Sequence, residues 1–239
     1  DLLDEAEKLN EFNLVKEISQ QLPIYTLSQI LGIPESDRQK LTEWMEFLEL
    51  AQYFTLEQIK QNEEGITDTT PDPALVEMFN NMIDEMFDYG RFILNKKKDK
   101  PENDLLSAIA NAKIEGEDLS QEFLDGSWLL IVFAGNDTTR NTMSGGIKLL
   151  NENSQQKQLV LDNFERVTGL INETVRCVSP VIHMRRTTLE ETIIGDQKIG
   201  PFEKIALWYG AANRDPEIFD DPDKFNIMRT NADQHLAFG

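Results

Sequence analysis

Apolar positions in the first fifty residues recur at the spacing of a helix. The side chains concerned are Leu14, Val15, Ile18, Leu22, Leu27, Ile30 and Leu31. Such spacing places apolar side chains on one helix face. Pro23 and the Gly-Ile-Pro corner at residues 32–34 interrupt the pattern. The sequence therefore predicts short helices separated by these breaks.

The same spacing predicts two more helices, over residues 35–54 and from Pro73 onward. Their apolar side chains are Leu41, Trp44, Met45 and Leu48 in the first, and Val76, Phe79, Met82, Ile83, Met86 and Phe87 in the second. A lysine run at residues 96–98 follows, shortly before Pro101. This combination favours an exposed connector without a binding role.

The most apolar stretch of the chain predicts a long central helix from Ser120, as its N-cap, to about Asn151. A further helix is predicted over residues 159–177. Threonine and isoleucine residues around Gly195 then indicate short strands with a turn, and Pro, Asp and Asn predict irregular coil from residue 210.

These elements predict a mainly α fold with small β-sheets. We expect a single domain over residues 1–239, mostly helical in 1–178, with short strands and a meander in 179–239. Because the sequence does not begin with Met, we expect this chain to be a fragment of a longer one.

Composition narrows the function. The 239 residues are 40% hydrophobic, which suffices for a buried core, and the formal net charge of -20 leaves no basic stripe for nucleic acid. The longest apolar run, residues 128–134, is far shorter than the roughly 20 residues of a membrane span. One cysteine and two histidines favour a cytoplasmic protein without a disulfide or a zinc cage.

A polar step interrupts the central helix in the sequence Ala134-Gly135-Asn136-Asp137-Thr138-Thr139. Glycine in a helix interior costs about 1 kcal/mol relative to alanine, and the following acid and alcohols compete for backbone hydrogen bonds. A lone glycine would indicate close helix packing. With the acid and alcohols attached, a ligand pressed against Gly135 becomes the favoured explanation.

Glu173 and Arg176 lie three residues apart and so share a face of the predicted helix. Pairs of this kind are usually solvated and contribute at most about 1 kcal/mol. Four further signatures follow in the tail: Arg185-Arg186, Ala212-Asn213-Arg214-Asp215-Pro216, Pro222-Asp223-Lys224-Phe225 and His235-Leu236-Ala237-Phe238-Gly239.

In this order, these motifs resemble the cytochrome P-450 family, the haem-thiolate monooxygenases, over essentially the whole chain. The resemblance implies a haem b cofactor and makes Asp137 and Thr138 the catalytic acid and alcohol. It places Ala134, Gly135 and Thr139 beside the haem.

The resemblance further implies that Glu173 and Arg176 form a buried structural pair, completed from the meander by Lys224 or Arg229. Arg186 and His235 match residues that bind the haem propionates. Phe238 would open the loop of the iron-ligating cysteine, which we expect beyond Gly239. Cys177 is expected to be a buried structural thiol.

A narrower match, to bacterial alkane terminal hydroxylases, rests on residues 135–146 and on His183-Met184-Arg185-Arg186-Thr187. It implies terminal hydroxylation of a medium-chain alkane or fatty acyl chain, with O2, a ferredoxin and an NAD(P)H-dependent reductase as partners. Ile131, Ala134, Val181, Ile182 and Met184 would form part of an apolar substrate wall, and His183 would be a further substrate-binding residue.

Three alternatives stay open. Related enzymes hydroxylate sterol side chains, terpenoids and branched lipids, and share Met184-Arg185-Arg186-Thr187. A helical protein that only binds an apolar ligand explains the long helix but not the tail motifs. The chain could also be inactive as it stands, while its parent is an enzyme.

Overall fold

The computed structural model describes residues 2–48 and 73–239. Two compact units divide it, one up to Asp137 and the other from Thr138 to Gly239. The boundary falls inside the long helix α6 (Gln121–Glu152), and we describe each unit by itself. The expectation of a single domain over residues 1–239 stays a prediction.

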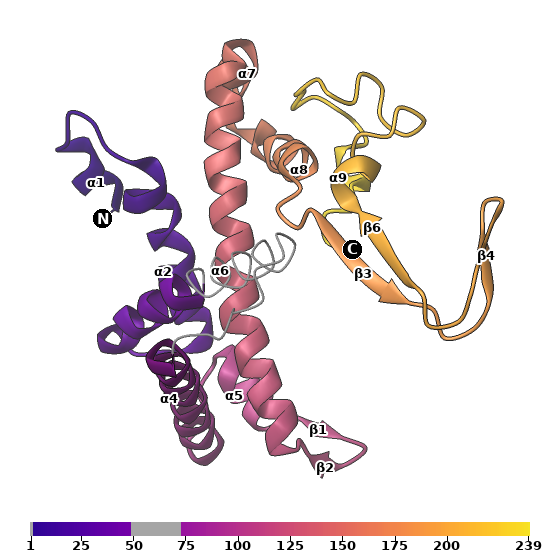
Figure 1. The fold of residues 1–239 in the computed structure, drawn as a ribbon. Coiled ribbons are helices and arrows are strands. Elements are labelled where there is room, and N and C mark those ends of the chain that lie inside the picture. The colour runs from indigo at the N-terminus through magenta and orange to yellow at the C-terminus, as the bar shows by residue number, and fades with distance from the viewer. Residues whose placement is uncertain (1, 49–72) are drawn as a thin grey trace. The chain divides into compact units, whose positions relative to one another are not determined.

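In the part of the chain that the structure describes, the first unit is helical apart from one small hairpin (Figure 1). Its elements are α1 (Leu2–Glu7), the π-helical η1 (Val15–Ser19), α2 (Gln21–Leu31), the 3-10 turn η2 (Glu35–Asp37), a helix over residues 38–48, α4 (Pro73–Asp99), α5 (Leu105–Ala110), β1 (Lys113–Ile114), β2 (Glu117–Asp118) and the start of α6. Gly32 ends α2 in a left-handed conformation at φ 66°. Pro23 lies inside α2 instead of breaking it.

Some predicted boundaries in this unit change. The helix expected over residues 35–54 begins with a 3-10 turn, and residues 49–54 lie outside the described part of the chain. The β1–β2 hairpin was not predicted from the sequence. Pro73 is the first described residue of α4, and Ser120 caps α6, since its hydroxyl accepts a hydrogen bond from the Phe123 N–H at 3.2 Å.

Aromatic side chains form the centre of the first unit. Trp44 and Trp128 are each 1% exposed, and Tyr89 lies against both. The Trp128 indole N–H donates to the Met86 carbonyl at 3.0 Å, so the buried polar atom of this ring is satisfied. A Cβ at Gly90 would lie 2.5 Å from the Trp128 ring, so only glycine allows this approach.

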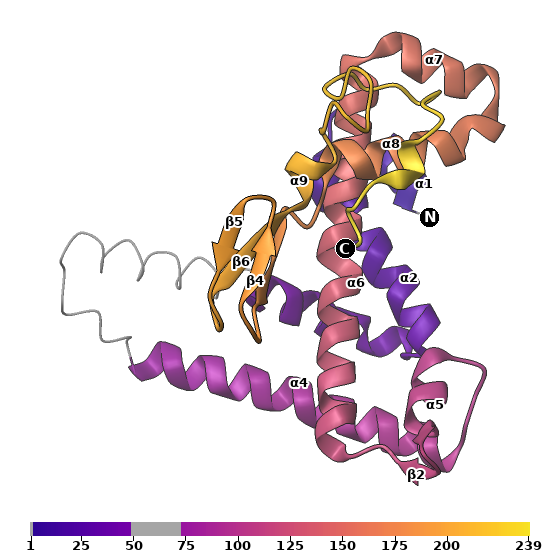
Figure 2. The same cartoon turned by 90° about the vertical axis from the view of Figure 1, so that its right-hand side faces the viewer.

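The lysine run at residues 96–98 is not an exposed connector, contrary to expectation. It belongs to the last turns of α4, whose C-terminal end lies beside α5 (Figure 2). Lys97 is 3% exposed and pairs with Asp104, the N-cap of α5, and with Glu102 at 2.6 Å. Burial works against the Lys97 charge, but these carboxylates hold its pKa above the usual 10.5. Lys97 therefore links the C-terminal end of α4 to the N-terminal end of α5.

We expect Asp104→Asn to destabilise the first unit by about 3 kcal/mol, because it leaves the buried Lys97 ammonium short of a partner. Burial raises the pKa of Asp104, but hydrogen bonds from Lys97 and Ser107 outweigh it and lower the pKa below 3.8. A lowered folded-state pKa stabilises the fold above the unfolded value, and this contribution is lost as the pH falls. Urea denaturation across acidic pH should therefore show a weaker pH dependence for the variant than for the parent.

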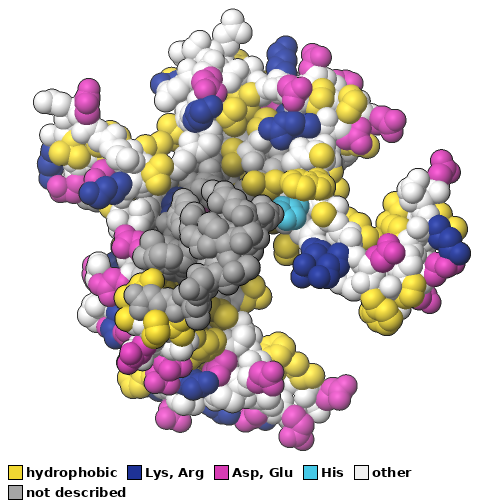
Figure 3. All heavy atoms as spheres, viewed as in Figure 1, with side chains coloured by type: hydrophobic (Ala, Val, Ile, Leu, Met, Phe, Trp, Pro, Cys, Tyr) yellow, Lys and Arg dark blue, Asp and Glu magenta, His cyan; other side chains and the backbone are white. Residues whose placement is uncertain are grey.

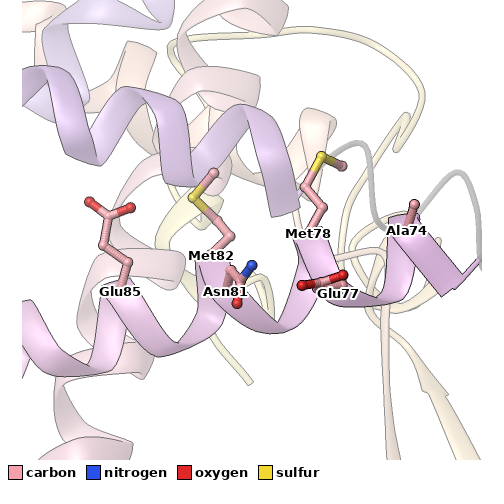
Figure 4. Close-up of a pocket in the computed structure, with 6 residues that line it drawn as sticks. All are labelled: Ala74, Glu77, Met78, Asn81, Met82 and Glu85. Carbon is pink, nitrogen blue, oxygen red and sulfur yellow. The ribbon is translucent and has the colours of Figure 1, made fainter.

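A shallow cavity of about 360 Å³ lies along α4. Figure 4 shows Met78 and Met82 on the same side of this helix. Its lining consists of Ala74, Glu77, Met78, Asn81, Met82 and Glu85. No residue proposed from the sequence as a site residue belongs to this lining.

The second unit contains the rest of α6, then α7 (Ser154–Asp162), the 3-10 turn η3 (Phe164–Arg166) and α8 (Val167–Val178). The single helix predicted over residues 159–177 is therefore wrong. Its break falls at Asn163, which has an extended backbone and whose side chain accepts from the Glu165 N–H at 3.0 Å. An asparagine oxygen that caps the following turn starts a new element in place of continuing the old one.

Antiparallel hairpins follow, as the sequence predicts. Strand β3 (His183–Thr187) pairs with β6 (Lys204–Trp208), and β4 (Thr192–Ile194) pairs with β5 (Gln197–Ile199) across Gly195 at φ 58°. The second hairpin continues from the far end of the first (Figure 1). A short helix α9 (Tyr209–Ala212) leads into the irregular tail, in which η4 (Ala232–Gln234) packs on α8.

Acidic and basic side chains are interspersed over the face that Figure 3 shows. Among the described residues, no helix combines the length and apolarity that a bilayer crossing requires.

Candidate functional site

A buried ion pair on α8 forms the centre of a network that binds the tail of the second unit. Glu173 and Arg176 are both fully buried, and the Arg176 Nε and Nη2 atoms each donate to one Glu173 oxygen at 2.8 Å. The two parallel bonds form the bidentate geometry that is strongest for this pair. Burial acts to lower the pKa of Arg176, but the bonds to Glu173 prevail and raise it above its usual value. The solvated surface pair weighed from the sequence is not what the structure shows.

The remaining donors of this pair hold the irregular tail in place. Arg176 Nη1 donates to the carbonyls of Asn213 at 2.7 Å and Pro222 at 2.8 Å. Arg229 completes the network, since its Nε lies 3.2 Å from both Glu173 oxygens. Lys224 contributes only its backbone carbonyl, at 3.3 Å from Arg176 Nη2. Of the two candidates left open by the sequence, the structure selects Arg229.

Asn213 extends this network toward His235; it belongs to a motif noted in the sequence, but the sequence assigned it no role. It is fully buried, and its Nδ2 donates to the Ser179 hydroxyl at 2.8 Å. Its Oδ1 accepts from the Leu236 N–H at 2.7 Å, next to His235. Neither sequence spacing nor composition indicates a link across 23 residues of coil. Through Asn213, the buried pair fixes the backbone that carries His235.

We expect Asn213→Ala to loosen the end of the chain. The change removes the acceptor of the part-buried Leu236 N–H, and an unsatisfied buried group costs about 1–3 kcal/mol, while the Ser179 hydroxyl keeps its bond to the Arg176 carbonyl at 2.9 Å. Hydrogen exchange at residues 235–239 should accelerate relative to the parent. Asn226→Ala is the matched control, because the Asn226 side chain caps only the exposed Met228 N–H at 3.1 Å. Equal exchange in both variants would contradict the role given to Asn213.

Cys177 follows Arg176 directly and is half-buried. Its sulfur lies 3.2 Å from Arg176 Nη2. Burial is the largest influence on this thiol and raises its pKa above 9.0. The group therefore stays a protonated thiol at neutral pH, in keeping with a structural role.

The β3–β6 register separates the predicted site residues into two faces. Met184 pairs with Leu207 and Arg186 with Ile205, and since side chains alternate along a strand, Met184 and Arg186 share one face. His183 belongs to the other face, where its ring stacks on Trp208 at 4.8 Å. His183 and Met184 therefore lie on opposite faces of this strand pair.

Arg186 is exposed, and its Nη1 donates to the Arg185 carbonyl at 3.0 Å. It forms no ion pair with any other described residue. Val181 is half-buried and Ile182 is 61% exposed, just before this strand. The hairpin thus presents a guanidinium beside apolar side chains.

His235 supplies a second donor in the same unit. Its Nδ1 accepts from the Ala237 N–H at 3.3 Å, so we assign the ring proton to Nε2. Burial lowers the pKa of His235 below 6.5, and the ring is neutral at pH 7. Phe238 packs edge-on against it at 5.1 Å. Arg186 and the His235 Nε2–H are donors of the kind that bind carboxylates.

The polar step of α6 lies in an unbroken helix. A Cβ at Gly135 would lie 3.1 Å from the Leu27 side chain, so packing against α2 accounts for this glycine without a ligand. By their spacing of three and four residues, Ile131, Ala134 and Thr138 share the helix face on which Gly135 also lies, with Asp137 at its edge. Asn136 is 2% exposed, and its Oδ1 has no hydrogen-bond donor within reach.

A family model described as "Cytochrome P450" matches residues 13–238, which include the buried pair, Asn213 and His235. The chain belongs to the cytochrome P450 family. Its mainly helical fold with small antiparallel sheets is that of cytochrome P450 structures. The crystal structure of CYP109E1 from Bacillus megaterium with corticosterone matches the whole chain and 60% of its own, at 28% identity and a TM-score of 0.84.

Two curated cytochrome P450 relatives are informative. "Cytochrome P450 109" of Bacillus spizizenii is 32% identical over the whole chain and 56% of its own length. The "Methyl-branched lipid omega-hydroxylase" of Mycobacterium bovis is 30% identical over 95% of the chain and 49% of its own length. The chain spans about half the length of the curated relatives it matches.

The donor set fits the cofactor of the cytochrome P450 family in part. A haem has two propionate carboxylates, and the second unit offers Arg186 and the His235 Nε2–H for them. Within the described ranges, no three His, Cys, Asp or Glu side chains are grouped to hold a metal ion.

Proposed function

We propose that the protein containing this chain is a haem-dependent monooxygenase that inserts one oxygen atom of O2 into an unactivated C–H bond. The observation that carries the proposal is the buried Glu173–Arg176–Arg229 network and its extension through Asn213 to His235. This network fixes a propionate donor in a segment that lacks regular structure. Holding His235 in place explains why the fold carries the free-energy cost of burying the charged side chains of Glu173, Arg176 and Arg229.

Arg186 and His235 would hold the two propionates, and Phe238 would pack against the cofactor from its edge contact with His235. Ala134 and Thr139 would contact the haem from α6. Gly135 would contact the haem only through its backbone, because the Leu27 side chain lies where a side chain at this position would point. When bound, a haem with a thiolate ligand supplies the activation of O2.

Asp137 and Thr138 are proposed as the proton-handling pair. They are consecutive residues of α6, so their side chains do not face each other directly, and a water between them would carry a proton from the Asp137 carboxyl group to the Thr138 hydroxyl. The half-buried environment of both side chains limits exchange with bulk water. The pair therefore explains why an otherwise apolar helix carries an acid and an alcohol.

We propose terminal hydroxylation of a medium-chain alkane or fatty acyl chain. Ile131, Ala134, Val181, Ile182 and Met184 would form the apolar wall, which gains about 0.8 kcal/mol per buried methylene. The relative named as an omega-hydroxylase of methyl-branched lipids supports a chain-end oxidation. The steroid in the CYP109E1 complex favours the alternative, hydroxylation of sterols, terpenoids or branched lipids.

The test uses the full-length protein with haem, a ferredoxin, its reductase, NADH and isotopically labelled O2. Products from n-alkanes, a methyl-branched lipid and a steroid are identified by mass spectrometry. Labelled primary alcohol from the alkanes supports the proposal. Labelled product from the steroid alone selects the alternative, and no labelled product from any substrate rejects the monooxygenase function. The assay also shows whether the electron supply is a ferredoxin and its NAD(P)H-dependent reductase, as we propose for a cytoplasmic enzyme.

We expect Thr138→Ala to divert reducing equivalents from alcohol into hydrogen peroxide. Without the hydroxyl, the last proton donor is missing, and loss of a general acid typically lowers the rate about 10²–10⁴-fold. The ratio of alcohol formed to NADH consumed should fall and peroxide should rise. Ser144→Ala is the control, because the Ser144 hydroxyl on the same helix bonds only to the Arg140 carbonyl at 2.9 Å. An unchanged ratio in Thr138→Ala would show that Thr138 does not deliver the proton.

A further inference from the structure

Three aromatic rings meet at the centre of the first unit. Tyr89 lies 5.4 Å from Trp44 and 5.8 Å from Trp128, and the two tryptophans are 6.3 Å apart, measured between ring centres. Their interplanar angles of 60°, 43° and 84° are tilted or edge-on arrangements. Such pairs contribute about 0.5–1.5 kcal/mol each beyond the area they bury. Packing alone would explain the contacts, but not the groups around Tyr89.

A carboxylate accepts a hydrogen bond from the Tyr89 phenol. The Tyr89 hydroxyl donates to Asp37 Oδ2 at 2.8 Å, in a half-buried setting. Burial, followed by the bond to Asp37, raises the pKa of Tyr89 above 10, so the phenol stays protonated at neutral pH. Removing an electron from a protonated phenol makes it a strong acid, and Asp37 is in place to receive that proton.

A cation near the ring favours the same outcome. The Lys40 ammonium lies 5.6 Å from the centre of the Tyr89 ring. A nearby positive charge is attracted to an electron-rich ring but repels a ring that has lost an electron. The oxidised ring is therefore stabilised by losing its proton to Asp37, which leaves a neutral radical.

We propose that Trp128, Trp44 and Tyr89 form a redox-active aromatic chain that ends in a proton-coupled oxidation of Tyr89. An outer-sphere one-electron oxidant takes one electron from a tryptophan of the chain, and Tyr89 replaces that electron. The phenolic proton moves to Asp37. The products are the reduced oxidant, a neutral Tyr89 radical and a protonated Asp37 carboxyl group.

The position of the aromatic chain on α6 suggests its function. Trp128 and Gly135 both lie on α6, seven residues apart, a rise of about 10 Å along the helix. An enzyme that handles O2 beside residues 134–139 produces oxidising equivalents there when substrate is absent. The aromatic chain would carry them away to Tyr89. This last step rests on the proposed function, whereas the redox chemistry of the three rings does not.

The test uses the full-length protein without NADH, reductase or substrate, so that no O2 chemistry takes place and the result is independent of the proposed function. The oxidant is a ruthenium(III) polypyridyl complex generated by a light flash, and the radical is trapped by freezing and recorded by electron paramagnetic resonance. All samples carry Trp208→Phe, because Trp208 is 57% exposed and would react first. Ring-deuterated tyrosine distinguishes a tyrosyl signal from a tryptophanyl one.

We expect a tyrosyl signal that is lost in Tyr89→Phe and kept in Tyr25→Phe. Tyr25 is the matched control because its hydroxyl accepts from Gln29 at 2.9 Å and is not bonded to a carboxylate. Asp37→Asn keeps a hydrogen-bond acceptor but not the base, so its radical yield should fall even where Tyr89→Phe folds poorly. A signal unchanged by Tyr89→Phe or by Asp37→Asn, a purely tryptophanyl signal, or no radical at all would overturn the proposal.

Discussion

Glu173→Ala should destabilise the second unit by about 3–5 kcal/mol, the cost of breaking a buried charge pair by removing one partner. The change strands two guanidiniums, because Arg176 is fully buried and the Arg229 side chain is 6% exposed. It also removes the acceptor of the Asn226 N–H at 2.9 Å. Chemical denaturation with hydrogen exchange resolved over residues 167–239 measures the loss. We expect the tail after residue 213 to exchange first.

Glu152→Ala provides the matched control. Glu152 pairs with Lys148 at 2.7 Å in the same unit, but both side chains are more than half exposed. An exposed pair four residues apart on a helix contributes about 0.3–0.5 kcal/mol. A comparable loss in the two variants would show that the network around Glu173 is no stronger than a surface bridge. Glu173→Gln should fall between them, since it keeps an acceptor and loses the charge.

Local signals in the sequence predicted local features well. Ser120 caps α6 because a hydroxyl before a helix can bond to the third residue along, and Gly195 turns a hairpin because it tolerates a positive φ. The spacing of Glu173 and Arg176 placed both on one face of a helix. Each of these inferences depends on residues within four positions of one another, where backbone geometry fixes the distance.

Contacts between distant segments could not be predicted in this way. The choice of Arg229 over Lys224 depends on how the coil after α9 folds back on α8, and the role of Asn213 depends on the same path. The burial of Lys97 required knowing that α5 begins beside the end of α4. A ligand was expected against Gly135 because the sequence did not show that the Leu27 side chain packs there. For Arg229, Asn213 and Gly135 the deciding partner lies 23 or more residues away, whereas the partners of Lys97 lie five and seven residues along, across the turn into α5.

Gly90→Ala should destabilise the first unit, although alanine is the better helix former by about 1 kcal/mol. A Cβ at this position would lie 2.5 to 2.7 Å from three atoms of the Trp128 indole. That ring is 1% exposed and lies between Trp44 and Tyr89, so it has no room to move. Overpacking of a rigid core costs about 1–3 kcal/mol and occasionally more, which exceeds the gain in propensity.

Gly126→Ala separates the two effects, because nothing lies within 4 Å of a Cβ at that position of α6. This control should be stabilised by the propensity gain alone, while Gly90→Ala loses stability in the same urea denaturation experiment. Adding Trp128→Phe to Gly90→Ala should restore part of the loss, since the smaller ring leaves space for the methyl group. If Gly90→Ala gained stability as Gly126→Ala does, the aromatic core would be more deformable than its burial implies, and the fixed ring geometry on which the redox chain depends would not hold.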